Sequence, residues 1–327
     1  MSFWEMLGNM FTGLWEKSGL AQGDWSNYVM IAISLVLMFL AIVKKFEPLL
    51  LLPIAFGMFI INIPGASEVL WMKTEVDEAT GEETVTRGLL GWLNYGVEYV
   101  IYPPLIFMGI GAMTDFGPLI ANPKSMLIGA AAQLGVFLTF FGAVVLGFDA
   151  AAAASIGIIG GADGPTAIYL TQALAKFTNH DLLSVIAIAA YSYMALIPII
   201  QKPIMKLMTT KKERAIKMSK VEKVIFPILV TLFVGILLPD AIPLLGMLML
   251  GNLMRESGVV NRLSQQAQNG LMNTITIFLG ICVGCKAIGT TFLQLQTLYI
   301  IVLGLVAFCC GTVGGLGMAK IMNKISG

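Results

Sequence analysis

The chain has 327 residues, of which 57% are apolar and 12% charged, whereas an ordinary soluble domain has roughly 25% charged residues. This composition excludes a soluble enzyme. With 20 Lys and Arg against 19 Asp and Glu, the net charge is +1, so no excess of charge points to nucleic acid or to an acidic partner. The charges are bunched, and they leave uncharged stretches of about the ~20 residues that a membrane-crossing helix needs: Ser125–Phe148, Leu182–Gln201 and Ala287–Ala319.

Several kinds of active site are excluded by the residue types. The chain has one histidine, His180, which leaves no Ser/His/Asp set and no metal site built on histidines. The four cysteines lie in apolar sequence that we expect to be helical: Cys282, Cys285, Cys309 and Cys310. A CxxC pair at 282 and 285 allows redox chemistry, but membrane-like flanks favour small residues that pack helices together.

The predicted elements begin with an interfacial segment over residues 1–27. Aromatic and leucine side chains recur there at helical spacing and predict a helix lying along the bilayer surface: Phe3, Trp4, Leu7, Phe11, Leu14 and Trp15. The segment has no basic start before an apolar core, so it is not a cleaved signal. Residues 28–97 follow as N-terminal helices with an acidic external loop.

The fold class is an all-α polytopic membrane protein with about nine crossing helices. The crossings are expected at Tyr28–Val43, Pro48–Ile63, Glu98–Thr114, Ser125–Phe148, Leu182–Ile200, Lys223–Leu238, Ile242–Met254, Leu271–Cys285 and Thr297–Ala319. One further apolar segment, Ala150–Ala175, is broken at its middle by Gly160-Gly161-Ala162-Asp163-Gly164-Pro165. Glycine and proline disfavour a straight helix there.

Charge counting predicts that the broken segment turns back as a re-entrant hairpin. Lys and Arg collect on the cytoplasmic side of membrane proteins. If the segment turns back, 15 of the 20 basic residues fall on one side, including the eight between Lys202 and Lys223. The N-terminus is then outside and the C-terminus cytoplasmic.

A faint internal repeat relates the two halves of the chain. Ile106–Ile110 recurs as Ile277–Ile281 at an offset of 171 residues. Five crossings separate the copies, so the halves are expected to be inverted, as in many transporters. The first repeat, with the hairpin, is expected over residues 98–176, and connecting helices with a basic cytoplasmic loop are expected over 177–265. The second repeat is expected over 266–327. It would be incomplete, because the counterpart of Asp163 falls beyond Gly327.

Asp163 is the residue most indicative of function. An ionised side chain at mid-bilayer costs ~2.5–3.5 kcal/mol or more, so it needs a compensating ligand or role. Its carboxylate, backbone carbonyls freed around Gly161 and Gly164, and the Thr166 hydroxyl form an all-oxygen set suited to Na+ or a proton. Because burial favours the neutral acid and a cation favours the carboxylate, the two ions would compete for one group. The alternative is that Asp163 only caps a half-helix.

Other polar residues have simpler interpretations. Tyr191 and Tyr193 suit an interfacial belt, although a hydroxyl facing the hairpin remains open. Asp115 and Asp240 suit turns. The basic loop fixes topology, or it docks an acidic cytoplasmic partner through Lys211, Lys212 and Arg214.

At this point a resemblance is evident. Runs over much of the chain resemble the β subunit of the Na+-translocating, biotin-dependent decarboxylases, which act on oxaloacetate, methylmalonyl-CoA or glutaconyl-CoA: Gly160–Thr166, Ile106–Lys124, Tyr191–Met194 and Leu245–Leu253. The resemblance implies a pump in a prokaryotic plasma membrane that decarboxylates carboxybiotin held by a partner subunit, consumes a proton and moves Na+ outward. It implies Asp163 as the Na+ and proton site and Tyr193 as a second member.

The resemblance also implies partners. It predicts a soluble carboxyltransferase subunit that carries the biotin, a small membrane anchor subunit and a homo-oligomer in the membrane, with no nucleic acid. The family has further site residues C-terminal to the position of Gly327, so we expect a shortened form. Two rival functions stay open: a Na+- or H+-coupled carrier of small organic anions, and a non-catalytic assembly subunit.

Overall fold

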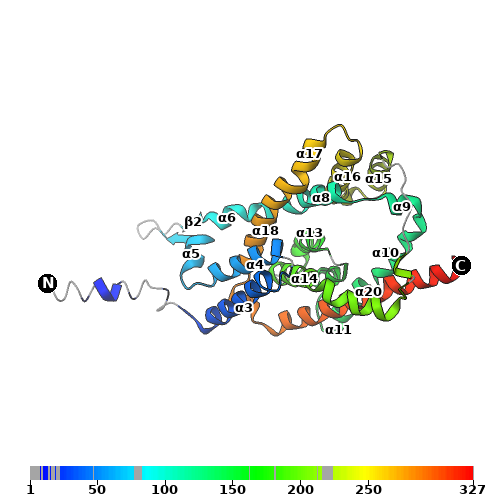
Figure 1. Ribbon diagram of the computed structural model, residues 1–327. Coiled ribbons are helices and arrows are strands. Elements are labelled where there is room, and N and C mark those ends of the chain that lie inside the picture. The colour runs from blue at the N-terminus through cyan, green and yellow to red at the C-terminus, as the bar shows by residue number, and fades with distance from the viewer. Residues whose placement is uncertain are drawn as a thin grey trace. The chain divides into compact units, whose positions relative to one another are not determined.

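The structure is a computed structural model that describes residues 8, 10–13, 15, 19, 23–46, 48–76, 83–161, 163–179, 182–211, 213–215 and 224–326, with only the backbone at 72–76, 83–85, 191–199, 215, 291 and 326. The chain forms two compact units (Figure 1). The first lies within Met1–Gly96 and Ile277–Thr297, and the second within Val97–Thr276 and Leu298–Gly327. Each is considered by itself below.

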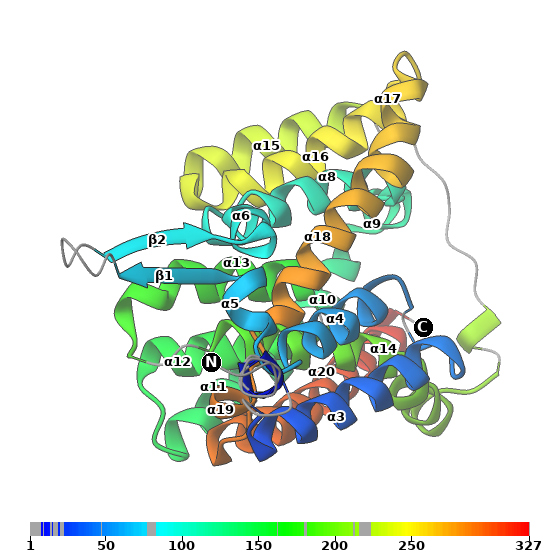
Figure 2. The same cartoon turned by 90° about the vertical axis from the view of Figure 1, so that its left-hand side faces the viewer.

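The first unit is built on two adjacent apolar helices, α3 (Trp25–Ile42) and α4 (Pro48–Ile61), which Figure 2 shows side by side. Its other elements are α5 (Ala66–Leu70), β1 (Met72–Val76), β2 (Glu83–Arg87), α6 (Leu89–Leu93), the start of α7 (Tyr95–Glu98), the end of α18 (Met272–Cys285), α19 (Gly289–Phe292) and the start of α20 (Leu295–Ser326). The side chains of Ile54, Met58 and Leu279 are fully buried.

The second unit contains most of the helices. They are α8 (Tyr102–Met113), α9 (Gly117–Ala121), η1 (Pro123–Ser125), α10 (Met126–Ala132), α11 (Leu134–Val145), α12 (Ala150–Gly157), η2 (Ile158–Gly161), α13 (Gly164–Leu174), η3 (Ala175–Phe177), α14 (Leu183–Met208), η4 (Glu213–Ala215), α15 (Ile225–Leu237), η5 (Pro239–Ala241), α16 (Ile242–Glu256), α17 (Asn261–Gln266), the π-helical turn η6 (Ala267–Leu271), the start of α18 and nearly all of α20. Helix α16 packs along α8 and against α15, and α11 packs on α12 (Figure 2).

The helical membrane character is confirmed, and the count of nine crossings is not. Four helical stretches among the described residues are long and apolar enough to cross a membrane: Trp25–Ile42, Pro123–Val145, Asn261–Cys285 and Leu295–Ile325. A fifth results if Leu89–Glu98 and Tyr102–Met113 count as one broken span. Helices α4, α8, α15 and α16 coincide with predicted crossings but have 14, 12, 13 and 15 residues, which is short for a hydrocarbon core of about 30 Å.

Prolines explain one of these shortened helices. The crossing expected from Glu98 begins instead at Tyr102, because Pro103 and Pro104 occupy its first turn and Val100 before it has a positive φ of 56°. Proline fits the first turn of a helix, and a residue with a positive φ cannot continue a right-handed helix. The apolar stretch is therefore divided before α8.

The acidic loop contains a structure that the sequence analysis did not anticipate. Strands β1 and β2 pair antiparallel, with Met72 opposite Arg87 and Val76 opposite Glu83. Threonine and valine are frequent in both strands, and β-branched residues favour extended backbone. A short hairpin therefore interrupts an otherwise helical chain.

Among the helices of each unit is a pair in very close contact. In the first unit, a β-carbon on Gly57 of α4 would clash with the carbonyl oxygen of Ile281, and one on Gly284 of α18 would clash with that of Ile54. In the second unit, a β-carbon on Gly111 of α8 would clash with the carbonyl oxygen of Leu248, and one on Gly251 of α16 would clash with that of Met108. Small residues allow such close backbone approach between membrane helices.

A buried asparagine accompanies each helix pair. Asn62 follows α4 and donates hydrogen bonds to the carbonyl oxygens of Met58 and Ala287, both at 2.8 Å, while its own oxygen accepts from the Gly289 amide at 3.1 Å. Asn252 of α16 donates to the carbonyls of Gly111 at 3.3 Å and Thr114 at 2.9 Å. Each asparagine thus links its own helix region to a backbone segment that lies at least 138 residues away in the sequence.

Candidate functional site

The predicted break in the apolar segment is present in the structure. Helix α12 ends at Gly157, η2 continues to Gly161, and α13 begins at Gly164. Asp163 is the N-cap residue of α13, with extended backbone at φ −131° and ψ 99°, and Pro165 lies in the first helical turn. The glycines end one helix and the Asp-Gly-Pro sequence begins the next, as capping preferences dictate.

The Asp163 carboxylate is held by the first turn of α13. The Thr166 hydroxyl donates to one carboxylate oxygen at 2.5 Å, and the Thr166 amide lies 3.5 Å from the other. The Asp163 side chain therefore caps α13, and this contact is compatible with either interpretation of the residue. It does not exclude ion binding, because a carboxylate oxygen has more than one lone pair.

The Asp163 side chain is partly enclosed and has no cationic partner among the described residues. It is half-buried, and Gly164 and Pro165 beside it are buried. Within the described part of the chain, no lysine or arginine forms an ion pair with it, and no group of three His, Cys, Asp or Glu side chains could hold a metal. Any cation here would rely on one carboxylate, hydroxyls and backbone oxygens.

The two outer ends of the broken segment are joined. Asp149 caps α12 by accepting a hydrogen bond from the Ala152 amide at 2.8 Å, and its second oxygen accepts from the Thr178 hydroxyl at 2.6 Å. Thr178 follows η3, directly after α13. Because the start and the end of the segment meet, α12 and α13 form the two arms of a hairpin with Asp163 near its tip.

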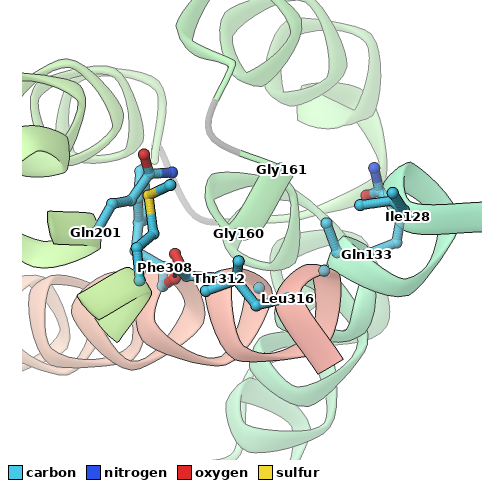
Figure 3. Close-up of a pocket in the computed structure, with 12 residues that line it drawn as sticks. Ile128, Gln133, Gly160, Gly161, Gln201, Phe308, Thr312 and Leu316 are labelled. Carbon is cyan, nitrogen blue, oxygen red and sulfur yellow. Dashed lines mark hydrogen bonds between the residues drawn. The ribbon is translucent and has the colours of Figure 1, made fainter. Parts of the chain in front are cut away.

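The hairpin tip borders a cavity of about 320 Å³. Gly160 and Gly161 contribute the tip, and Figure 3 shows Gln133 and Gln201 on opposite sides of it, with Phe308, Thr312 and Leu316 of α20 below. The remaining lining residues are Ile128, Ala132, Met205, Gly311 and Gly315. We call this cavity the tip pocket.

The structure places some of the predicted site residues together and leaves the side chain of another outside the described residues. Asp163, Gly164 and Thr166 lie together in one turn, and Gly161 lines the tip pocket. Tyr193 lies within helix α14, but its side chain is outside the described residues. Sequence analysis did not single out Gln133 or Gln201, although Gln133 is the only amide side chain in the uncharged stretch Ser125–Phe148, which is the signal that was available.

The basic loop is described in part. Lys211 and Arg214 are exposed, and Lys212 is outside the described residues. Arg214 donates to both the hydroxyl and the carbonyl oxygen of Thr209. Hydrogen bonds from the Thr210 amide and hydroxyl lower the pKa of the Glu213 carboxyl, so this loop carries an anion among its cations at neutral pH.

The residues for which the sequence favours a turn or a packing role lie in turns or within helices. Asp115 accepts a hydrogen bond from the Gly117 amide at 2.8 Å and forms a turn between α8 and α9. Asp240 lies in η5 between α15 and α16. Cys282 and Cys285 are free and buried, with the Cys285 thiol 3.3 Å from the Gly57 carbonyl oxygen. This placement agrees with a role in packing α18 on α4.

Comparison with known proteins identifies the family. The family model for the Na+-transporting oxaloacetate decarboxylase beta subunit matches residues 26–327. The glutaconyl-CoA decarboxylase subunit beta of Acidaminococcus fermentans is 52% identical over 97% of this chain and 81% of its own length. The methylmalonyl-CoA decarboxylase subunit beta of Propionigenium modestum is 52% identical over 95% of this chain and 82% of its own length. The oxaloacetate decarboxylase beta chain of Klebsiella pneumoniae is 46% identical over 98% of this chain and 85% of its own length. The chain therefore belongs to the family of Na+-transporting decarboxylase β subunits, and it is a multi-pass membrane subunit of a sodium-pumping decarboxylase.

Proposed function

We propose that this subunit decarboxylates carboxybiotin held by a partner subunit and uses the reaction to move Na+ outward through a site at Asp163. The observation that supports this most directly is the broken helix at that residue. The N-terminus of α13 carries partial positive charge that favours the Asp163 carboxylate, while the free carbonyls at the end of η2 favour a cation. One site can thus stabilise the carboxylate with Na+ bound and, after Na+ leaves, hold a proton.

The chemistry requires a proton. When carboxybiotin loses CO2, its carbon–nitrogen bond breaks and the ring nitrogen takes up a proton. Moving one Na+ against 100 mV costs ~2.3 kcal/mol, so outward transport needs such a chemical driver. Exchange of Na+ and a proton at Asp163 links the two events, and Tyr193 of α14 is the proposed second member of the site.

The proposed topology is a re-entrant hairpin. The hydrogen bond between Asp149 and Thr178 supports a segment that enters and leaves on one side. The basic residues then place the N-terminus outside and the C-terminus in the cytoplasm, in the plasma membrane of a prokaryote. In this topology Gln201 and Met205 of α14 and Gly315 and Leu316 of α20, which line the tip pocket, lie toward the cytoplasmic ends of their helices.

An inverted repeat is also part of the proposal. At the offset of 171 residues, the starts of α8, α9 and α10 fall within two residues of the starts of α18, α19 and α20. In both halves an apolar helix is followed by a helix of about one turn and then by an apolar helical stretch, Pro123–Val145 in the first half and Leu295–Ile325 in the second, and this succession supports the weak sequence repeat. Inverted repeats commonly place ion sites at broken helices.

The proposed partners are a biotin-carrying carboxyltransferase subunit, a small membrane anchor subunit and further copies of this chain. Lys211, Lys212 and Arg214 are the proposed docking residues for an acidic surface of the biotin carrier.

The test uses the assembled complex reconstituted in vesicles. Asp163→Asn keeps one acceptor oxygen for Thr166 and removes the negative charge, so we expect assembly to persist and Na+-dependent decarboxylation to stop. The matched control is Asp115→Asn, which keeps the turn bond to Gly117 and should retain activity. Undiminished Na+ uptake by Asp163→Asn contradicts the proposal, as does Na+ flux driven by an organic anion without a biotinylated partner.

A further inference from the structure

The tip pocket combines two amide groups with an apolar floor. Gln133 lies between α10 and α11, and Gln201 lies in α14. Figure 3 shows them on opposite sides of the hairpin tip. Phe308 and Leu316 of α20 contribute apolar surface between them.

The polar groups of the pocket have unused hydrogen-bonding capacity. Within the described residues, neither glutamine side chain makes a hydrogen bond. Each amide offers two donors and one acceptor oxygen. The Thr312 hydroxyl donates to the Phe308 carbonyl at 2.8 Å, which leaves its oxygen as an acceptor. A planar ligand that carries both N–H and C=O groups would satisfy this set.

Exposed lysines follow the lining residues along two helices. Lys202 and Lys206 come directly after Gln201 and Met205 on α14. Lys320 lies four residues, about one turn, after Leu316 on α20, and Lys324 follows it. These cations create a positive potential at this end of the unit, which raises the local concentration of an anionic ligand.

We propose that the tip pocket binds the carboxylated ureido ring of the biotin presented by the partner subunit, with Gln133 and Gln201 as its hydrogen-bonding residues. This inference rests on the proposed function and assigns its ligand to a place in the fold. The ureido C=O and N–H pair with the two amides, the ring body lies on Leu316 beside the largely buried Phe308, and the carboxylate is attracted by the lysines.

The tip pocket lies close to the proposed ion site. Gly161 lines the pocket and is two residues from Asp163 in the chain. Decarboxylation there would take up its proton close to the proposed ion site. The glutamines bind and orient the ring, and proton exchange stays with Asp163.

A labelling experiment tests binding without reference to activity. In the assembled complex, Gln133→Cys and Gln201→Cys are each alkylated with a maleimide in the presence and absence of free biotin, and the parent chain gives the background from its four cysteines. We expect biotin to slow alkylation at both positions about fivefold or more, and to have no effect at Gln265→Cys, a control on the exposed surface of α17. Failure of either pocket cysteine to react, or reaction unaffected by biotin, overturns the inference.

A kinetic experiment separates this inference from the proposed function. Gln133→Ala and Gln201→Ala should each raise the KM for the biotinylated partner about fivefold, the effect of one lost hydrogen bond, and leave the Na+ concentration for half-maximal activity unchanged. Gln201→Glu should raise the KM further by repelling the carboxylate. If Asp163→Asn stops turnover while the glutamine variants match the parent, the pocket assignment is wrong and the proposed function stands. If Asp163→Asn stays active, the proposed function itself fails.

Discussion

The Thr178 hydroxyl donates a hydrogen bond of 2.6 Å to the Asp149 carboxylate, and these two residues stand at the opposite ends of the broken helical segment. The bond fixes the segment as a hairpin whose two arms start and finish together. The other Asp149 oxygen accepts a hydrogen bond from the Ala152 amide and caps α12. One side chain therefore begins one arm and holds the end of the other.

This arrangement predicts energetic coupling between the two positions. Asp149→Ser keeps a cap for α12 but loses the bond to Thr178, and Thr178→Val loses the same bond from the other side. A double-mutant cycle on the free energy of unfolding in detergent should give a coupling of about 0.5–1 kcal/mol, as for a partly exposed hydrogen bond to a charged group. Additive effects of the two substitutions would show that the bond does not hold the hairpin ends together.

The contact between α8 and α16 predicts intolerance of any side chain at Gly251. Gly251→Ala should lower the free energy of unfolding by about 1–3 kcal/mol, because the added carbon meets the Met108 carbonyl and overpacking forces the helices apart. The control is Gly317→Ala on α20, where a β-carbon meets no atom within 4 Å; it should be neutral or more stable by up to about 1 kcal/mol from helix propensity. Equal thermal stabilities of the two variants contradict the prediction.

The two buried asparagines predict different penalties. Asn62→Ala removes three hydrogen bonds, to Met58, Ala287 and Gly289, whereas Asn252→Ala removes two, to Gly111 and Thr114. At about 1 kcal/mol a bond, with buried partners left unsatisfied, Asn62→Ala should be the more destabilising. Thermal unfolding of both variants checks the order, and a larger loss at Asn252 would contradict it.

The Thr166 hydroxyl predicts a change in Na+ affinity. Thr166→Val removes the donor to Asp163 and an oxygen from the proposed cation site, so the Na+ concentration for half-maximal activity should rise about tenfold, while Thr166→Ser keeps the hydroxyl and should stay near the parent. Both variants keep the Thr166 backbone amide that the cap uses. A Val variant with parental Na+ dependence would restrict Thr166 to capping.

The sequence alone located the break at Asp163 because local rules are sufficient there. Glycines end a helix and an Asp-Gly-Pro run begins one whatever lies around them. The long uncharged stretches likewise predicted helices at each expected crossing. Their lengths were less well predicted, since Pro103 and Pro104 start α8 later than hydropathy alone implies.

The tertiary structure decided which distant residues meet. Gln133, Gln201 and Thr312 line one cavity from three separate segments of the chain, and Asn252 bonds to Thr114 across 138 residues of sequence. Hydropathy records only that a residue can lie in a membrane helix, and an apolar helix presents similar surfaces all round. Close contacts at Gly111 and Gly251, and the hydrogen bonds of buried amides, select the partners, and these become defined only when the helices pack.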